Sequence, residues 1–320
     1  MKYDIVCSTK NLSTEEWLKI RTLGIGGSDA GIIAGCNPYR SIFELWQEKR
    51  GEIPVKEEES EVIHFGKVLE DVVRKEFIQR TGLMVRKKNS ILRSKEYPFM
   101  IADLDGVVSE FDGTYSIFEA KTAIEFKNND WKNGEIPKAY QLQVQHYLAV
   151  TGFQKAYIAV LVGGNKFYWT EVYRDEQLIK MLVSMESHFW HCVREGEEPD
   201  VDASKATSLY LGAKYNNAKV GSVIDLDEQM LSVIEKYEQI KIELDSLTEQ
   251  KQLIENQLKS ALAENEAGRV GGHIVKWKPI VQTRIDSNKL KKEHKEIYDA
   301  CKKEAVSYTH LRAHETSLHL

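Results

Sequence analysis

The chain has 320 residues, is 42% hydrophobic and 29% charged, and carries a formal net charge of −5. This composition is typical of a water-soluble protein with a sizeable core, and it predicts one large domain with an appendage. No apolar run approaches the roughly 20 residues that span a bilayer, and the polar first residues lack the apolar segment of a signal peptide, so we expect a cytoplasmic protein. The four cysteines stand far apart, which argues against a zinc knuckle or a compact disulfide framework.

The N-terminal part predicts helices followed by a meander of strands. A helix begins at Ser13, with Glu16 completing a capping box, and runs through the glycine-rich GIGGSDAG into a second helix. Amphipathic helices are expected over 41–50 and 61–81, and strands over 84–92, 99–109 and 114–122. A helix over 137–151 ends at Gly152, two strands joined by GGN follow, and a helix spans 174–195.

The pattern divides the chain into four parts. Residues 1–195 predict an α/β domain, 196–222 a connector, and 223–305 a helical, coiled-coil-like region with a short strand in HIVKWKPIV. In that region apolar residues recur at spacings of three and four, interrupted by Lys251, which favours a helical hairpin or subunit-packing helix over a long independent coiled coil. Residues 306–320 begin with VSYTHLRAHET, which resembles a translated sequencing adapter; the alternative is a natural His-rich tail.

The stretch ADLDGVVSEFDGTYSIFEAKTA sets Asp105 before a hairpin and Glu119 and Lys121 on its second strand. Side chains alternate on a strand, so Glu119 and Lys121 share one face, and pairing with the preceding strand brings Asp105 to the same edge. Two carboxylates with a main-chain carbonyl suit Mg²⁺, and a nearby lysine can position or deprotonate a water. Alone, the pattern also fits an exposed ion pair at a strand edge.

Flanking residues favour a nucleic-acid site. Glu70 lies on an upstream helix, where it could bind a second metal ion. Gln143 and Tyr147 stand four apart on one helical face, where a glutamine can bind the lysine or a phosphate and a tyrosine can contact DNA. Arg21 and Ser28 flank the glycine-rich turn, and an arginine beside a hydroxyl at a helix start is suited to an anion.

The motifs RTLGIGGSDAGIIAG, FGKVLED, LDG, FEAK and YQLQVQHYLAVTGFQKAYIAVLVGGN together resemble the YqaJ-type viral recombinase family. These are relatives of phage alkaline exonucleases within the PD-(D/E)xK nuclease superfamily. The resemblance covers about residues 12–175 and implies a restriction-endonuclease-like core, a central mixed sheet flanked by helices. It also implies two-metal, 5′-to-3′ digestion of duplex DNA ends, with a single-strand-annealing recombinase of the RecT or Red-beta type as partner in a phage or prophage.

Carried over residue by residue, the resemblance implies a metal site and a catalytic group. Asp105, Glu119 and the carbonyl of Ala120 would hold Mg²⁺, with Mn²⁺ as a substitute, and Glu70 would complete a second site. Lys121 would orient or activate the attacking water. Many relatives carry a bulkier apolar residue in place of Ala120, a departure that should cost little because the carbonyl is the ligand.

The resemblance also implies the DNA contacts and the oligomer. Gln143 would support the lysine, Arg21 and Ser28 would receive the 5′-phosphate, and Tyr147 with Gln145 would contact DNA. A ring-shaped trimer is implied for the oligomer, without a membrane contact. Two alternatives stay open, a RecB-like or Cas4-like endo- or exonuclease, against which the scattered cysteines argue, and a DNA-binding scaffold without catalysis.

Overall fold

The computed structural model describes residues 2–54, 60–216, 221–279, 283 and 285–302. The chain forms two compact units, Met1–Asn216 and Asn217–Leu320. Within the described ranges, no helix is both long enough and apolar enough to cross a membrane. The adapter-like stretch expected over 306–320 lies outside the described residues.

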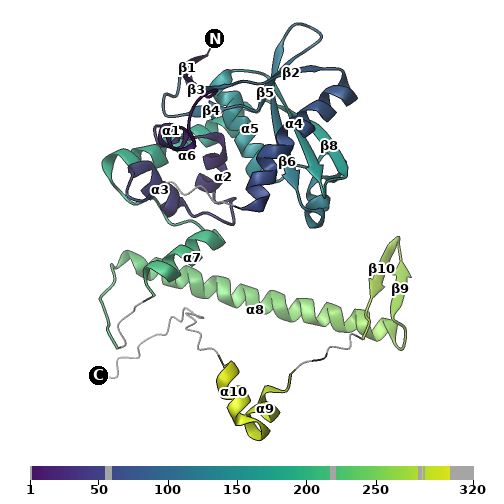
Figure 1. Cartoon of the computed structure of the whole chain (residues 1–320). Helices are drawn as coiled ribbons and strands as arrows, with labels where there is room; N and C mark the ends of the chain where they lie inside the picture. The colour runs from purple at the N-terminus through teal and green to yellow at the C-terminus, as the bar shows by residue number, and fades with distance from the viewer. Residues whose placement is uncertain (1, 55–59, 217–220, 280–282, 284, 303–320) are drawn as a thin grey trace. The chain divides into compact units, whose positions relative to one another are not determined.

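The first unit is an α/β structure (Figure 1). Its elements, in chain order, are β1 (Tyr3–Ser8), α1 (Thr14–Arg21), α2 (Gly27–Ile33), α3 (Ile42–Arg50), α4 (Glu61–Thr81), β2 (Met84–Arg86), β3 (Ser90–Ser94), β4 (Ile101–Asp103), β5 (Gly106–Ser109), β6 (Tyr115–Ala123), the 3-10 helix η1 (Glu125–Gly134), α5 (Lys138–Thr151), β7 (Lys155–Val162), β8 (Lys166–Tyr173), α6 (Glu176–Glu195) and α7 (Lys205–Lys214).

A five-stranded mixed sheet is the centre of this unit. Its strand order is β2-β5-β6-β7-β8; the β6–β7 pair is parallel and the other pairs are antiparallel. A second sheet has the order β1-β3-β4. The predicted central mixed sheet flanked by helices is confirmed. The crossover from β6 to β7 runs through η1 and α5, as parallel pairing requires.

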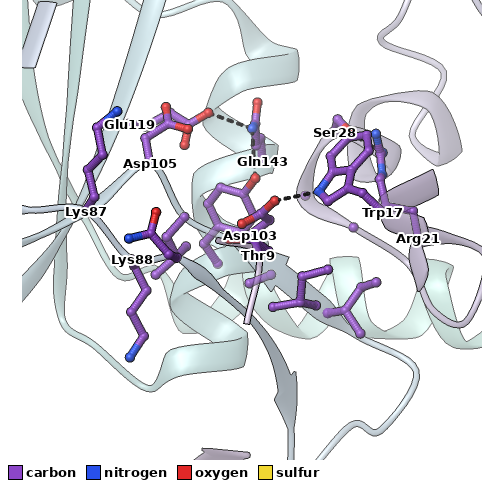
Figure 2. Close-up of a pocket in the computed structure, with 18 of the residues that line it drawn as sticks. Thr9, Trp17, Arg21, Ser28, Lys87, Lys88, Asp103, Asp105, Glu119 and Gln143 are labelled. Atoms are coloured by element: carbon purple, nitrogen blue, oxygen red, sulfur yellow. Dashed lines mark hydrogen bonds between the residues drawn. The ribbon is translucent and has the colours of Figure 1, made fainter. Parts of the chain in front are cut away.

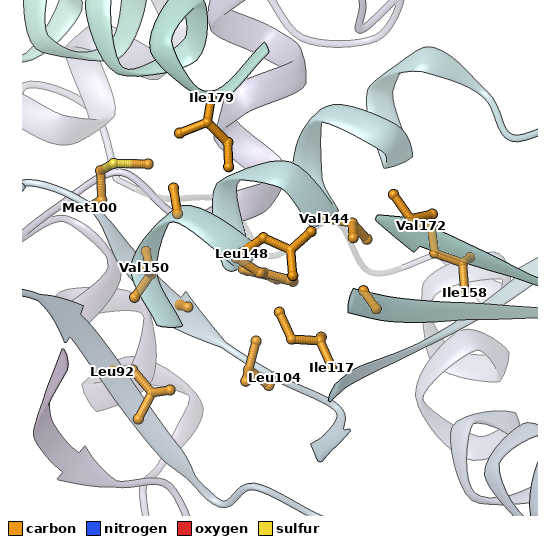
Figure 3. Close-up of a cluster of buried hydrophobic side chains, with 14 of the residues drawn as sticks. Leu92, Met100, Leu104, Ile117, Val144, Leu148, Val150, Ile158, Val172 and Ile179 are labelled. Carbon is orange, nitrogen blue, oxygen red and sulfur yellow. The ribbon is translucent and has the colours of Figure 1, made fainter. Parts of the chain in front are cut away.

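Helices α4 and α5 cover the two faces of the mixed sheet. Phe118 of β6 packs on Phe77 of α4, with ring centroids 5.1 Å apart. Its neighbour Ile117 points the other way, into the core formed with Val144 and Leu148 of α5 (Figure 3). This alternation follows from the strand geometry and buries apolar side chains on both faces. Glu119 and Lys121, two and four residues beyond Ile117, therefore face α5.

Local capping chemistry sets the helix limits. Ser13 caps α1 in a capping box with Glu16, as predicted. Helix α4 occupies the predicted range, and Gly152 ends α5 with a left-handed φ of 74°. Strand β1 and helix η1 are additional to the predicted elements. Strand β1 is mostly exposed and lacks an alternating pattern of buried residues. Helix α7 lies in the predicted connector; it stacks Tyr210 on Phe43 of α3, with centroids 5.2 Å apart.

Helix α2 packs closely on α5, and glycine makes this approach possible. A Cβ on Gly27 would lie 2.4 Å from the ring of Tyr147, and one on Gly31 would lie 3.1 Å from Ala139 Cβ. The loop before α2 is also tied to strand β4, because Ile25 pairs with Met100 as an isolated bridge. These contacts hold the start of α2 beside α5 and β4.

The second unit contains α8 (Gln229–Leu262), β9 (Ala267–Val270), β10 (His273–Lys276), α9 (Ser287–Glu293) and α10 (Lys295–Cys301). Strands β9 and β10 form an antiparallel hairpin. Its turn is Gly271-Gly272, and both glycines adopt a positive φ that favours this residue type. The region expected to form a helical hairpin or a subunit-packing helix contains the single long helix α8, so a hairpin is not formed by residues 229–262. Strand β10 lies within the stretch HIVKWKPIV where a strand was expected, and β9 is an additional strand.

Candidate active site

Asp105 lies at the open end of the β5–β6 hairpin. Strand pairing stops at Gly106 opposite Phe118. Beyond this pair, the Asp105 carboxylate takes the place of a main-chain acceptor on the neighbouring strand. Its Oδ2 accepts a hydrogen bond from the Ala120 N–H at 2.8 Å. The N–H and C=O of one strand residue point to the same side, so the Ala120 carbonyl also turns toward this edge. A carboxylate and a carbonyl therefore share the edge.

Glu119, Lys121 and Gln143 meet on the sheet face that α5 covers. Lys121 Nζ donates to Glu119 Oε1 at 2.5 Å. Gln143 Nε2 donates to the same oxygen at 2.7 Å (Figure 2). Glu119 is 2% exposed. Its second oxygen, Oε2, is buried without a hydrogen-bond partner among the described residues. A buried carboxylate oxygen left unpaired is costly, so this atom is suited to a cation.

Burial controls the protonation of these groups. It raises the pKa of Asp105 well above its ordinary value, and the neighbouring Glu119 raises it further. Burial also raises the pKa of Glu119, although Lys121 opposes this effect. For Lys121, burial would lower the pKa, but Glu119 and Asp105 together raise it. Without a metal ion, Lys121 is therefore an ammonium donor, and it can orient a water but not deprotonate one.

Glu70 of α4 faces the same cavity but has a cationic partner. Lys87 Nζ lies 3.4 Å from Glu70 Oε1 and 3.5 Å from Asp71 Oδ1. The Glu70 charge reaches Asp105 and Glu119, since it contributes to raising the pKa of each. In the part of the chain that the structure describes, no three His, Cys, Asp or Glu side chains form a ready-made metal cluster. Glu70 is thus close enough to influence the charges of Asp105 and Glu119, but the three carboxylates do not form a complete metal-binding cluster.

Four of these residues, Glu70, Asp105, Glu119 and Gln143, line one cavity of about 410 Å³. Figure 2 shows Asp105 and Glu119 on one side of it, Arg21 and Ser28 on the other, and Asp103 between them. The lining residues are Thr9, Trp17, Arg21, Gly26, Gly27, Ser28, Glu70, Lys87, Lys88, Asn89, Ile91, Ile101, Ala102, Asp103, Leu104, Asp105, Glu119, Gln143 and Tyr147. The cavity therefore joins a carboxylate-rich end to an end with an arginine and a hydroxyl.

The Arg21 guanidinium is held in place by three groups. Its Nη2 donates to Ser28 Oγ at 2.7 Å and to Asp29 Oδ1 at 3.1 Å. The guanidinium carbon lies 5.0 Å from the ring centroid of Trp17, in a cation–π contact. Trp17 in turn donates through Nε1 to Asp103 Oδ2 at 2.8 Å. An arginine fixed beside a hydroxyl in this way can receive a phosphate without first being ordered.

A buried ion pair lies behind Arg21. Lys49 Nζ donates to Asp29 Oδ2, to the Arg21 carbonyl and to the Gly24 carbonyl, each at 2.7 Å. Asp29 also accepts from the Gly26 N–H at 2.9 Å. Burial alone would raise the pKa of Asp29, but Lys49 and Arg21 hold it below its ordinary value. The pair links α1, the following loop, α2 and α3.

The family of the chain follows from its sequence relatives. The YqaJ-like viral recombinase domain matches residues 16–154. A protein of Bacillus subtilis (strain 168) named "Uncharacterized protein YqaJ" is 42% identical over 312 residues, covering 97% of this chain and 96% of the relative. The chain belongs to the YqaJ-like viral recombinase family. The matched YqaJ-like segment begins in α1 and ends after α5, so it contains every residue of the cavity except Thr9.

Solved structures of exonucleases are similar to the YqaJ-like chain at lower levels. An alkaline exonuclease from Laribacter hongkongensis is 19% identical, with a TM-score of 0.48. The matched region covers 64% of this chain and 100% of the exonuclease. A phage-related exonuclease from Haemophilus somnus 129PT is 14% identical, with a TM-score of 0.41, and covers 57% of this chain and 100% of that one.

Two predicted DNA contacts of the YqaJ-like domain have other roles in the structure. Gln145 is 1% exposed and does not line the cavity; its amide donates to the Tyr173 carbonyl at 2.7 Å and accepts from the Asp175 N–H at 3.0 Å. Because Gln145 lies two residues after Gln143 on the same helix, its side chain points away from the site. Its two hydrogen bonds hold the connection between β8 and α6 in place. Tyr147 lines the cavity but is 5% exposed, and its hydroxyl accepts from Gln143 Nε2 at 3.1 Å.

Gln143 also differs from its predicted contact, since it bonds Glu119 rather than Lys121. The sequence-based prediction of the site did not include Asp103, Trp17, Lys87 or Lys49. Asp103 could have been found from its spacing, because it lies two residues before Asp105. Trp17 likewise lies one helical turn before Arg21.

Proposed function

We propose that this chain is a divalent-cation-dependent exonuclease that digests duplex DNA ends from 5′ to 3′ and leaves 3′ overhangs for an annealing recombinase. The observation that carries the proposal is the meeting of Asp105, Glu119 and Lys121 on one hairpin, with the buried Glu119 Oε2 unpaired. Family membership supports the same reading, because recombination by annealing needs single-stranded ends. The Arg21–Ser28 pair in the same cavity supports a substrate with a terminal phosphate.

The donor set fits a hard cation such as Mg²⁺, with Mn²⁺ as a substitute. Asp105, Glu119 and the Ala120 carbonyl supply oxygen atoms at one edge, and such oxygens are the ligands that Mg²⁺ prefers. Burial raises the pKa values of Asp105 and Glu119 because their negative charges are poorly solvated. A bound cation would neutralise these charges. When bound, the ion supplies a Lewis acid and lowers the pKa of its water. Glu70 would join a second site after Lys87 releases it.

The chain's own residues position the reactants. Lys121, held as an ammonium by two carboxylates, orients the attacking water or the scissile phosphate. Gln143 holds Glu119 Oε1 by a hydrogen bond, which leaves the unpaired Oε2 as the atom that would bind a cation. Arg21 and Ser28 bind the 5′-phosphate at the far end of the cavity. With the terminal phosphate bound there, the scissile bond lies at a fixed distance from the DNA end. This favours an exonuclease over an endonuclease.

The test is digestion of a linear duplex labelled at one end, with 5′-phosphate or 5′-hydroxyl termini, beside a covalently closed circle. We expect loss of the 5′-phosphorylated strand in Mg²⁺, none in EDTA, and an intact circle. Ca²⁺ should permit binding with little cleavage, because its looser geometry positions water poorly. Asp105→Asn should abolish digestion, whereas Asp112→Asn in the exposed turn of the same hairpin is the matched control. Cleavage of the circle would indicate an endonuclease, and binding without any cleavage would indicate a scaffold.

A further inference from the structure

Positive charge is concentrated in the segment that follows α8. Residues 266–302 contain nine lysines and arginines but five aspartates and glutamates, a net charge of +4, although the whole chain carries −5. Helix α8 itself contains six acidic and four basic residues. Such a separation of charge along a chain is typical of a segment that binds a polyanion.

The β9–β10 hairpin presents the first three of these cations on one face. Its register places Ile274 opposite Arg269 and Lys276 opposite Ala267, and Lys278 follows two residues beyond Lys276. Because strand side chains alternate, Arg269, Ile274, Lys276 and Lys278 share one side of the hairpin, which we call the cationic face. All four residues are exposed. The cationic face is therefore open to a ligand.

The opposite face of the hairpin packs on the end of α8. A Cβ on Gly268 would lie 2.9 Å from Leu262 Cδ2, and Leu262 is buried. Lys259 Nζ lies 5.8 Å from the ring centroid of Trp277, in a cation–π contact. These contacts anchor the hairpin at the C-terminal end of the helix (Figure 1). The cationic face is thus turned away from α8 and toward water.

Two of the three cations have no counter-charge. Lys278 Nζ lies 3.4 Å from Glu266 Oε2, in an exposed ion pair that contributes little. Arg269 and Lys276 form no ion pair with any residue that the structure describes. An anionic ligand could therefore bind both side chains without first breaking a salt bridge.

We propose that the cationic face binds the phosphate backbone of duplex DNA. Its cations complement the phosphate charges, and a two-stranded ribbon is an element that the major groove, about 12 Å wide, admits. Duplex DNA is favoured over a single strand, because single strands are bound by stacking their bases on aromatic side chains. The ring-bearing residues of the hairpin, His273 and Trp277, lie on the opposite face.

This inference rests on the proposed function for its choice of DNA, and it adds a contact outside the cavity. The cavity would hold the end of the duplex, whereas the cationic face would hold base pairs away from the end. A second, sequence-independent contact of this kind keeps the enzyme on its substrate between successive cleavages.

The test is binding of the full chain to a short labelled duplex whose two ends are closed by loops, measured by fluorescence anisotropy in EDTA. Closed ends deny the cavity a terminal phosphate, and EDTA prevents cleavage. Arg269→Gln with Lys276→Gln removes two phosphate contacts, so the slope of log affinity against log salt should become shallower by about 1.8. The affinity advantage of the wild type should thus fall roughly twelvefold between about 50 and 200 mM salt.

Two further double variants are the controls. Lys236→Gln with Lys241→Gln removes the same charge from α8 and should leave the slope unchanged. Arg269→Lys with Lys276→Arg keeps the charge of the cationic face and should keep the slope of the wild type. Circular dichroism shows whether each variant is folded.

Four results would overturn the proposal. They are a wild type that does not bind the closed duplex, an equal loss of slope in the α8 control, and an unchanged slope in the glutamine variant, which would point to an acidic protein as the partner. The fourth is a loss of slope with single-stranded DNA alone, which would assign the face to the strand that digestion leaves.

Failure of this proposal is distinct from failure of the proposed function. A chain that digests DNA ends but shows an unchanged slope lacks the second contact. A chain that cleaves nothing but loses slope in the glutamine variant keeps the contact and is not an exonuclease. Where both proposals hold, the glutamine variant should remove fewer nucleotides per binding event when a DNA trap is present.

Discussion

The substitution Lys49→Met removes a buried charge while keeping most of the side-chain volume. Lys49 is 4% exposed as a side chain, and its three ammonium protons go to Asp29, the Arg21 carbonyl and the Gly24 carbonyl. Methionine leaves both carbonyls without this donor and leaves the buried Asp29 with Arg21 as its remaining cation. Removing one partner of a buried ion pair costs about 3–5 kcal/mol. For a unit of this size, 3 kcal/mol corresponds to a fall in Tm of roughly 6–12 °C.

The assay is urea unfolding at pH 7, followed by tryptophan fluorescence and circular dichroism. Lys49→Met, Asp29→Asn and the double variant form a cycle, in which the double variant should cost less than the sum of the single ones. Lys87→Met is the control, because its ion pairs with Glu70 and Asp71 are exposed and should contribute less than about 1 kcal/mol. A loss below about 1 kcal/mol in Lys49→Met would refute the role given to the buried pair.

The pH dependence has a definite sign. Because Lys49 and Arg21 hold the folded pKa of Asp29 below its ordinary value, Asp29 stabilises the fold above its unfolded pKa of about 3.9. That contribution is lost as the pH falls below this value toward the folded pKa. The stability difference between the wild type and Lys49→Met should therefore shrink below about pH 4. A difference that stays constant with pH would show that the loss arises from packing alone.

Three further predictions concern the cavity, and a fourth concerns Gln145, which lies outside it. Without divalent cations, Asp105→Asn should raise the free energy of unfolding at pH 8, because burial and Glu119 raise the folded pKa of Asp105 and its contribution is lost as the pH rises; thermal unfolding in EDTA at pH 5 and pH 8 measures this. Mg²⁺ at ten times its dissociation constant should stabilise the wild type by about 1.4 kcal/mol but not Asp105→Asn, and an equal shift in both would place the ion elsewhere. Arg21→Gln should slow digestion of 5′-phosphorylated ends far more than of 5′-hydroxyl ends, whereas Gln145→Ala should lower stability by about 1–3 kcal/mol and leave kcat/KM within twofold.

The sequence by itself determined the features that depend on neighbours along the chain. The alternation of strand side chains placed Glu119 and Lys121 on one face, and the hairpin brought Asp105 to their edge. Capping residues such as Ser13 and Gly152 fixed the ends of helices, because their hydrogen bonds close within one turn. The heptad spacing of α8 likewise follows from residues that are three and four apart.

Only the tertiary structure decided which distant side chains share a hydrogen bond. Gln143 bonds Glu119 and not Lys121, and Gln145 faces the β8–α6 connection, because the rotation of α5 about its axis is set by its packing on α2 and the sheet. The contacts of Lys49 with Asp29 and of Trp17 with Asp103 join segments 20 and 86 residues apart. No local periodicity predicts such pairs. Each side chain is restricted to one partner only when it is buried, and burial occurs after the helices and the sheet have packed together.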